Sequence, residues 1–92
     1  MYKYVLTQDA EDDLEIIFQY WIGQFGIMQA LDYYEDFFKT FEKIAQNPFM
    51  FSSASHIKFG FRSCVCGVDT IYYKILDEFT IEINTIIGRQ DF

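Results

Sequence analysis

The sequence is poor in the residue types from which most enzyme active sites are made. Its 92 residues include one His, one Pro, one Trp and two Cys. Because His56 is the only histidine, no catalytic triad with a histidine base can form without it, and its position where a loop meets a strand suits an ordinary exposed side chain. There is no phosphate-binding loop, no glycine-rich dinucleotide motif and no zinc-protease motif. The sequence therefore offers no motif for these enzyme classes.

The two cysteines, Cys64 and Cys66, are separated by one residue. A zinc site needs four protein ligands, or three and an open position, so a single C-x-C pair is a weak indication of a metal. Strand alternation places both sulfur atoms on one face, in poor geometry for a disulfide between them. We interpret the pair as small strand side chains near a hairpin, and we expect no metal or other cofactor.

Positive charge and long apolar runs are also scarce. Seven Lys and Arg face fourteen Asp and Glu, and the net charge of −7 argues against strong binding to nucleic acid through phosphate contacts alone. No apolar run approaches the ~20 residues of a membrane helix. No signal-peptide pattern follows Met1. We therefore expect a cytoplasmic protein with reduced cysteines and no membrane contact.

Apolar side chains, and aromatic ones above all, are abundant. Hydrophobic residues make up 51% of the chain and aromatic residues 21%, a composition that excludes disorder. The length indicates a single domain over residues 1–92. So many aromatic residues in so small a domain suggest that a partner covers some of them.

The first half of the chain has helical periodicity after a short strand over residues 2–6. Thr7 suits the N-cap of a helix. Apolar residues then recur at intervals of three and four in two stripes, one ending at Phe25-Gly26 and one running from Ile27 to Asn47-Pro48. The pattern predicts an antiparallel helical hairpin. The first helix carries acidic but no basic residues, which we interpret as a solvated face.

The second half has the period of two that is typical of half-buried strands. It predicts strands over 56–62, 70–76 and 79–87, with a bulge at Gly60 and a tight turn at Asp77-Glu78. The expected fold is α+β: an N-terminal strand, a helical hairpin and a three-stranded antiparallel sheet in the order β-α-α-β-β-β. The hairpin covers the apolar face of the sheet.

The polar face of this sheet is the candidate site. By alternation it carries Lys3, Lys58, Arg62, Tyr72 and Lys74 against Glu82, so a negative protein presents a locally positive face. Basic and tyrosyl groups can orient phosphates, act as general acids or anchor a protein interface. The alternative is that these groups only keep the face solvated.

The ordered set of motifs resembles the ParE-type toxins of the RelE/ParE superfamily, from bacterial toxin–antitoxin systems. The resemblance runs nearly end to end and no single motif is diagnostic. Its motifs are Tyr4-Val5-Leu6-Thr7, Asp13-Leu14, Phe25-Gly26, Ile44-Ala45-Gln46-Asn47-Pro48, Arg62-Ser63, Ile71-Tyr72-Tyr73-Lys74-Ile75 and the tail Ile86-Ile87-Gly88-Arg89-Gln90-Asp91-Phe92.

This resemblance implies a toxin that binds and poisons DNA gyrase, is not an enzyme, and is neutralised by a cognate ParD-like antitoxin. The antitoxin is expected to cover the apolar groove beside the helical hairpin and part of the sheet. The residues expected to bind the target or the antitoxin are Arg62, Tyr72, Lys74, Arg89, Gln90 and Asp91.

Two alternatives stay open: a RelE-like ribosome-dependent mRNA endonuclease, and a non-toxic antitoxin-binding module. Many relatives carry histidine near Asp69 and basic residues near Thr85 or Ile87, and most are less acidic. These departures leave open a different target or an attenuated toxin.

Overall fold

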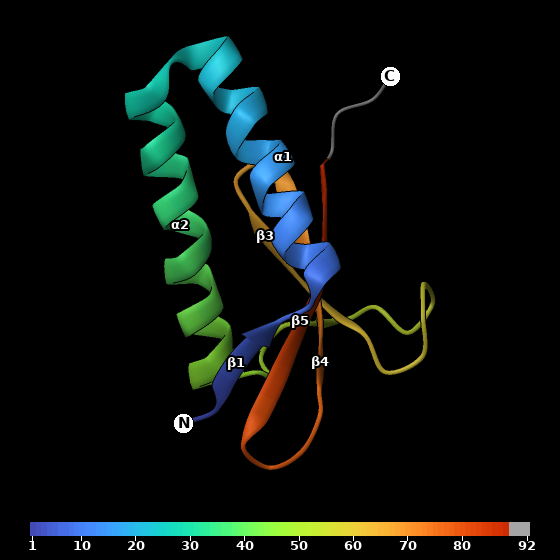
Figure 1. The fold of residues 1–92 in the computed structure, drawn as a ribbon. Helices are drawn as coiled ribbons and strands as arrows, with labels where there is room; N and C mark the ends of the chain where they lie inside the picture. The colour runs from blue at the N-terminus through green and yellow to red at the C-terminus, as the bar shows by residue number, and fades with distance from the viewer. Residues whose placement is uncertain (89–92) are drawn as a thin grey trace.

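The structure, a computed structural model, describes residues 1–88 and consists of two layers. A helical hairpin covers one face of a five-stranded sheet (Figure 1). The elements are β1 (Lys3–Leu6), α1 (Gln8–Phe25), α2 (Ile27–Gln46), β2 (Ser52–Ser53), β3 (Arg62–Cys66), β4 (Asp69–Ile75) and β5 (Thr80–Gly88). The order across the sheet is β1-β5-β4-β3-β2. This arrangement confirms the expected α+β class.

Both helices begin and end where the sequence pattern indicates. The Thr7 hydroxyl caps α1 by accepting a hydrogen bond from the amide of Ala10 at 3.1 Å. Gly26 joins the helices with a φ of +89°, which a residue with a side chain rarely adopts. α2 stops at Gln46, before Asn47-Pro48. The helical hairpin is therefore specified by local sequence signals.

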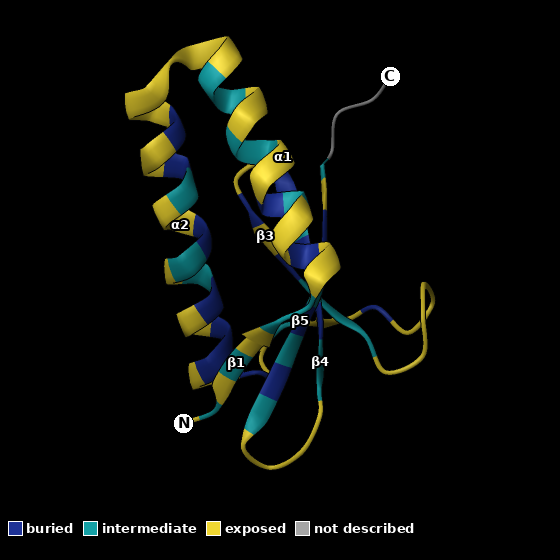
Figure 2. Cartoon of the chain, in the orientation of Figure 1, coloured by how far each residue is buried: buried dark blue, intermediate teal, exposed yellow. Residues whose placement is uncertain are grey.

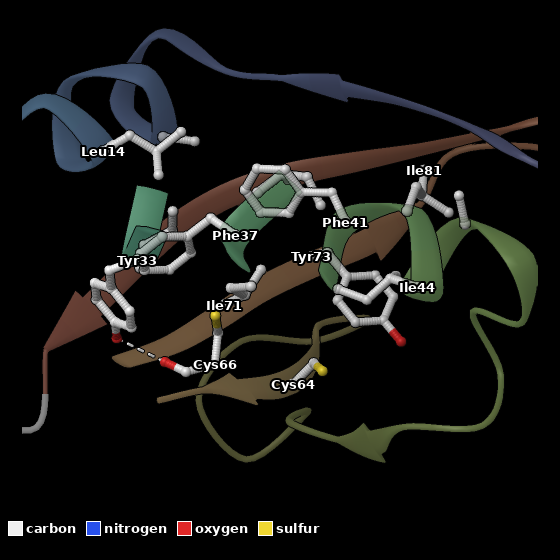
Figure 3. Packing of buried hydrophobic residues seen from close by; sticks show 14 residues of the cluster. Leu14, Tyr33, Phe37, Phe41, Ile44, Cys64, Cys66, Ile71, Tyr73 and Ile81 are labelled. Carbon is white, nitrogen blue, oxygen red and sulfur yellow. Dashed lines mark hydrogen bonds between the residues drawn. The ribbon is translucent and has the colours of Figure 1, made fainter. Parts of the chain in front are cut away.

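The core lies between α2 and the inner face of the sheet. Phe37, Phe41 and Ile44 of α2 are fully buried. They belong to one cluster with buried side chains of β4 and β5: Ile71, Tyr73, Ile81 and Ile83 (Figures 2 and 3). Complete burial of a side chain of this size stabilises the fold by roughly 1.5–3 kcal/mol. This contact fixes the helical hairpin on the sheet.

The sheet is larger than expected and mixed in direction. β1 pairs with β5 in parallel, whereas the pairs β5–β4, β4–β3 and β3–β2 are antiparallel. The expectation of a three-stranded antiparallel sheet was therefore incomplete. Sequence periodicity reveals strands, but pairing between segments about 77 residues apart depends on the tertiary fold.

The strand predicted over residues 56–62 was wrong for residues 56–61, and only Arg62 belongs to a strand, β3. Residues 56–61 form turns, in which the amide of Ile57 donates to the Ala54 carbonyl at 2.9 Å and that of Phe61 to the Lys58 carbonyl at 3.0 Å. Gly60 has a φ of +85° and lies in a turn, not at a bulge. Ile57 and Phe59 are exposed. The residues there alternate between apolar and polar side chains as in a strand, but their backbone forms turns.

The β-bulge lies instead in β5. Tyr72 is opposite Thr85 and Tyr73 is opposite Ile83, so Asn84 is the extra residue. The bulge shifts the buried positions of β5 from Ile81 and Ile83 to Ile86, a step of three. Phe79, expected to face the core, precedes the strand and is exposed.

The edge of β5 beyond the bulge is tied to the start of α1. The Asp13 carboxylate accepts hydrogen bonds from the Thr85 hydroxyl at 2.8 Å and the Ile86 amide at 3.0 Å. The Thr7 hydroxyl donates to the Asn84 carbonyl at 2.8 Å. One acidic side chain of α1 therefore has a structural role, although the helix pattern alone indicated a solvated acidic face.

Candidate functional site

Two of the predicted site residues share the open face of the sheet. Tyr72 and Lys74 alternate along β4 with Ile71 and Tyr73, which are fully buried beneath the helices. Lys74 is paired with Glu82 of β5. Tyr72 and Lys74 therefore point away from the helical hairpin, as predicted. Arg89, Gln90 and Asp91 lie outside the described residues.

Arg62 lies on the opposite, helix-covered side. It is paired with the buried Tyr73 in the β3–β4 ladder, and paired residues point to the same face. Its guanidinium donates to the carbonyls of Phe51 at 2.7 Å and Phe49 at 3.4 Å. The expectation that Arg62 and Lys58 join the basic open face was therefore wrong. The turns around Gly60 interrupt the alternation, so the phase of β3 is independent of the residues before it.

Tyr73 and Arg62 together hold the segment that follows α2. The Tyr73 hydroxyl donates to the Pro48 carbonyl at 2.5 Å, and burial raises its pKa to about 12. The Arg62 guanidinium lies 5.3 Å from the centre of the Phe49 ring. Both side chains are therefore structural ties, and neither is placed as a free catalytic group.

A groove of about 400 Å³ opens between the two helices and β1. Its walls are mainly apolar and its rim carries two carboxylates of α1, Glu11 and Glu15. The apolar lining residues are Tyr4, Val5, Leu6, Leu14, Tyr34 and Phe38. Such a groove suits a segment that has apolar side chains and positive charge.

The outer edge of β1 adds backbone groups to this groove. β1 is the outermost strand, and the amides of Lys3 and Thr7 donate toward β5, to the carbonyls of Phe79 and Ile83. Because peptide groups alternate in direction along a strand, those of Tyr4 and Leu6 point to the open edge. An exposed strand edge of this kind can pair with an extended partner segment.

A buried polar cluster holds the turn between β3 and β4. The Tyr33 hydroxyl contacts the Cys66 carbonyl at 2.8 Å (Figure 3). It also contacts Asp69 Oδ2 at 2.6 Å and accepts from the Val68 amide at 3.2 Å. Gly67 has a φ of +59°, and a Cβ there would lie 2.5 Å from the Tyr33 ring. The turn therefore requires glycine and the tyrosine together.

Asp69 is almost completely enclosed in this cluster. Only 1% of its surface is exposed, and burial raises the pKa of its carboxyl. Burial and the hydrogen bond to Asp69 also raise the pKa of Tyr33. At the sequence level Asp69 was only a departure from the family pattern. Its position between the apolar residues Val68 and Ile71 was the one available signal of burial.

The cysteines are buried strand side chains next to the turn between β3 and β4, as interpreted from the sequence. Cys64 and Cys66 are free, buried and on the same face of β3. Burial raises the pKa of both thiols, which disfavours the reactive thiolate. Within residues 1–88, no group of three or more His, Cys, Asp or Glu could hold a metal ion. Neither helix in this range is long and apolar enough to cross a membrane.

Comparison with known proteins gives consistent matches along the chain. A family model described as "ParE toxin of type II toxin-antitoxin system, parDE" matches residues 4–91. "Toxin ParE1" of Caulobacter vibrioides is 32% identical over 75 residues, which cover 82% of this chain and 78% of the relative. "Toxin ParE1" of Mycobacterium tuberculosis is 26% identical over 88 residues, covering 96% and 90%.

A solved structure described as "Chromosomal ParDE TA system from P. aeruginosa" has the same fold. It superposes with a TM-score of 0.84 over 98% of both chains, at 17% sequence identity. The arrangement of hairpin and mixed sheet is therefore common to proteins of very different sequence.

The Asp69→Asn variant is expected to gain stability relative to wild type as the pH rises. The pKa of the Asp69 carboxyl in the folded state is raised above its ordinary value of 3.8. As the pH rises above 3.8, the unfolded chain loses this proton more readily than the folded chain, so the free energy of unfolding of the wild type falls. Asparagine keeps an acceptor for the Tyr33 hydroxyl but carries no charge. Urea denaturation across a pH series, from below the ordinary value to neutrality, measures the difference.

Asp12→Asn, on the exposed side of α1, is the matched control. Tyr33→Phe should lower the free energy of unfolding by roughly 1–3 kcal/mol, because the Val68 amide and Asp69 lose their hydrogen-bond partner. A difference between Asp69→Asn and wild type that stays flat or shrinks with pH contradicts the assignment.

Proposed function

Because the chain belongs to the ParE toxin family of type II toxin–antitoxin systems, we propose that it inhibits DNA gyrase and is neutralised by a cognate ParD-like antitoxin. The observation that carries the proposal is the family match over residues 4–91, which covers all helices and strands of the fold except Lys3, the first residue of β1. The inhibition of gyrase is what the resemblance to ParE-type toxins implies. The toxin acts by binding and not by catalysis, in the cytoplasm.

The antitoxin occupies the groove between the helices and β1. Two features of the groove support this occupant: the open edge of β1 accepts an extended strand, and the apolar lining accepts alternate side chains of that strand. Glu11 and Glu15 on the rim favour Lys or Arg in the bound segment. The acidic balance of this toxin thus selects an antitoxin segment with basic residues.

The open face of the sheet is the second proposed contact surface. Tyr72 and Lys74 supply an aromatic ring and a positive charge there, a combination that suits a protein interface. Arg89, Gln90 and Asp91 follow β5 directly in the sequence and remain proposed contact residues. Arg62 acts indirectly. Its guanidinium donates to the carbonyls of Phe49 and Phe51 and so holds the segment that follows α2.

Induction of this chain alone in a bacterial host is expected to stop DNA synthesis first. Pulse labelling of DNA and protein synthesis after induction separates the proposed function from its alternative. Continued translation during the arrest of DNA synthesis, with cleaved DNA accumulating in a purified gyrase assay, supports gyrase inhibition. Early arrest of translation indicates an mRNA endonuclease instead, and accumulation of soluble protein without any arrest indicates a binding module.

Two single variants should separate the surfaces. Lys74→Ala should weaken growth arrest while the antitoxin affinity stays unchanged, because Lys74 lies on the face opposite the groove-forming helices. Glu15→Lys should weaken antitoxin binding about tenfold, since it replaces an attraction on the groove rim with repulsion.

Isothermal titration calorimetry with the purified antitoxin and a growth assay provide the two readouts. The Glu15→Lys variant should therefore arrest growth even when the antitoxin is co-expressed at a level that protects cells from wild type. Wild-type behaviour of Lys74→Ala in both assays would remove the open face from the site.

A further inference from the structure

The segment between α2 and β3, residues 49–61 and called the 49–61 loop below, includes the two-residue strand β2, which pairs with β3 and helps to hold the segment in a defined shape at its base. Ala54 is buried, and its amide donates to the Phe61 carbonyl at 2.7 Å. The amide of Lys58 donates back to the Ala54 carbonyl at 3.2 Å. Arg62 holds the first part of the loop through the Phe51 carbonyl at 2.7 Å. Turn hydrogen bonds and one guanidinium therefore fix this loop, which projects from the sheet (Figure 1).

The loop presents apolar side chains to solvent. Phe59 is 92% exposed and Ile57 is 56% exposed, in the turns between Ala54 and Phe61. Phe49 and Met50 are exposed at its start. Because the backbone of this loop is already ordered, binding costs little backbone conformational entropy, which favours its exposed apolar side chains as interface anchors.

The loop also lies in the longest acid-free part of the chain. Residues 43–68 contain no Asp or Glu, although the whole chain carries fourteen acidic residues. The same segment carries Lys43, His56, Lys58 and Arg62. Lys58 lies 5.5 Å from the centre of the Phe61 ring, beside the exposed Phe59 in sequence. The charged side chains of residues 43–68 are thus basic, whereas the rim of the antitoxin groove carries the acidic Glu11 and Glu15.

We propose that the 49–61 loop is a contact surface for the target protein, and that it binds an acidic surface with an apolar pocket for Phe59. This inference rests on the proposed function, because it names where the toxin meets its target. A basic antitoxin segment suits the acidic groove, and an acidic partner suits this loop. Nucleic acid fits less well, since the loop itself offers one lysine and the chain has a net charge of −7.

The test compares Phe59→Ser and Lys58→Glu with matched controls elsewhere on the surface. Phe79→Ser alters another exposed phenylalanine, in the turn before β5, and Lys39→Glu reverses another exposed lysine, on α2. Growth arrest is measured for each variant, together with binding to purified DNA gyrase, to the purified antitoxin and to a DNA duplex. Thermal unfolding confirms that each variant is folded.

Each loop variant should lose at least about tenfold in gyrase affinity and should need a higher expression level to arrest growth. Antitoxin affinity should stay at the wild-type value, and both controls should behave as wild type. Rising salt should weaken wild-type binding to gyrase more than that of Lys58→Glu.

Three results with the variants overturn the inference. Loop variants that bind gyrase and arrest growth like wild type remove the loop from the target site. An equal loss of antitoxin affinity in the loop variants assigns the loop to the antitoxin. Loss of binding to a DNA duplex, with gyrase affinity unchanged, assigns it to nucleic acid. If wild type itself neither binds gyrase nor stops DNA synthesis, the proposed function fails, and the inference falls with it.

Discussion

The parallel pairing of β1 with β5 brings the two ends of the fold together and sets the place from which the helical hairpin starts. It joins the first strand of the chain to the last described one, with Lys3 opposite Thr80 and Leu6 opposite Ile83. The connection to α1 begins immediately after β1, so this pairing also places the helical hairpin over the inner face of the sheet. It leaves the outer edge of β1 open, and this edge forms one wall of the groove. The same strand pairing therefore sets the architecture and leaves open the strand edge at the proposed antitoxin site.

Charge divides the molecule into surfaces that suit different partners. The acidic rim of the groove lies on α1, whereas the 49–61 loop lies in a segment without any acidic residue. Net charge alone describes neither surface, because it averages them. A toxin that must bind a neutralising partner and a cellular target benefits from this division, since complementary charges steer each partner to its own surface.

Local signals in the sequence were sufficient for the helices and for the phase of β4. The Thr7 cap, the Gly26 junction and the Asn47-Pro48 stop act within a few residues, and each was read correctly. The alternation of Tyr72 and Lys74 with Ile71 and Tyr73 likewise gave the correct open face. These features follow from the backbone preferences of a few neighbouring residues or from the alternation of side chains along one strand. Both can be recognised in a single sequence.

Features that depend on contacts between distant residues could not be predicted in this way. Arg62 changes face because turns around Gly60 reset the alternation, and Asn84 forms a bulge that no glycine marks. Asp13 and Asp69 resemble surface carboxylates in sequence, yet they bond to β5 and to Tyr33 respectively. The groove combines residues of β1, α1 and α2 and therefore exists only in the folded chain.

Separate surfaces for the antitoxin and the target can be distinguished by NMR-detected amide hydrogen exchange on the toxin–antitoxin complex. We expect slower exchange for the Tyr4 and Leu6 amides, which point to the open edge of β1, and unchanged exchange across residues 49–61. Protection of the 49–61 loop with no change at Tyr4 and Leu6 would place the antitoxin on the loop instead of the groove.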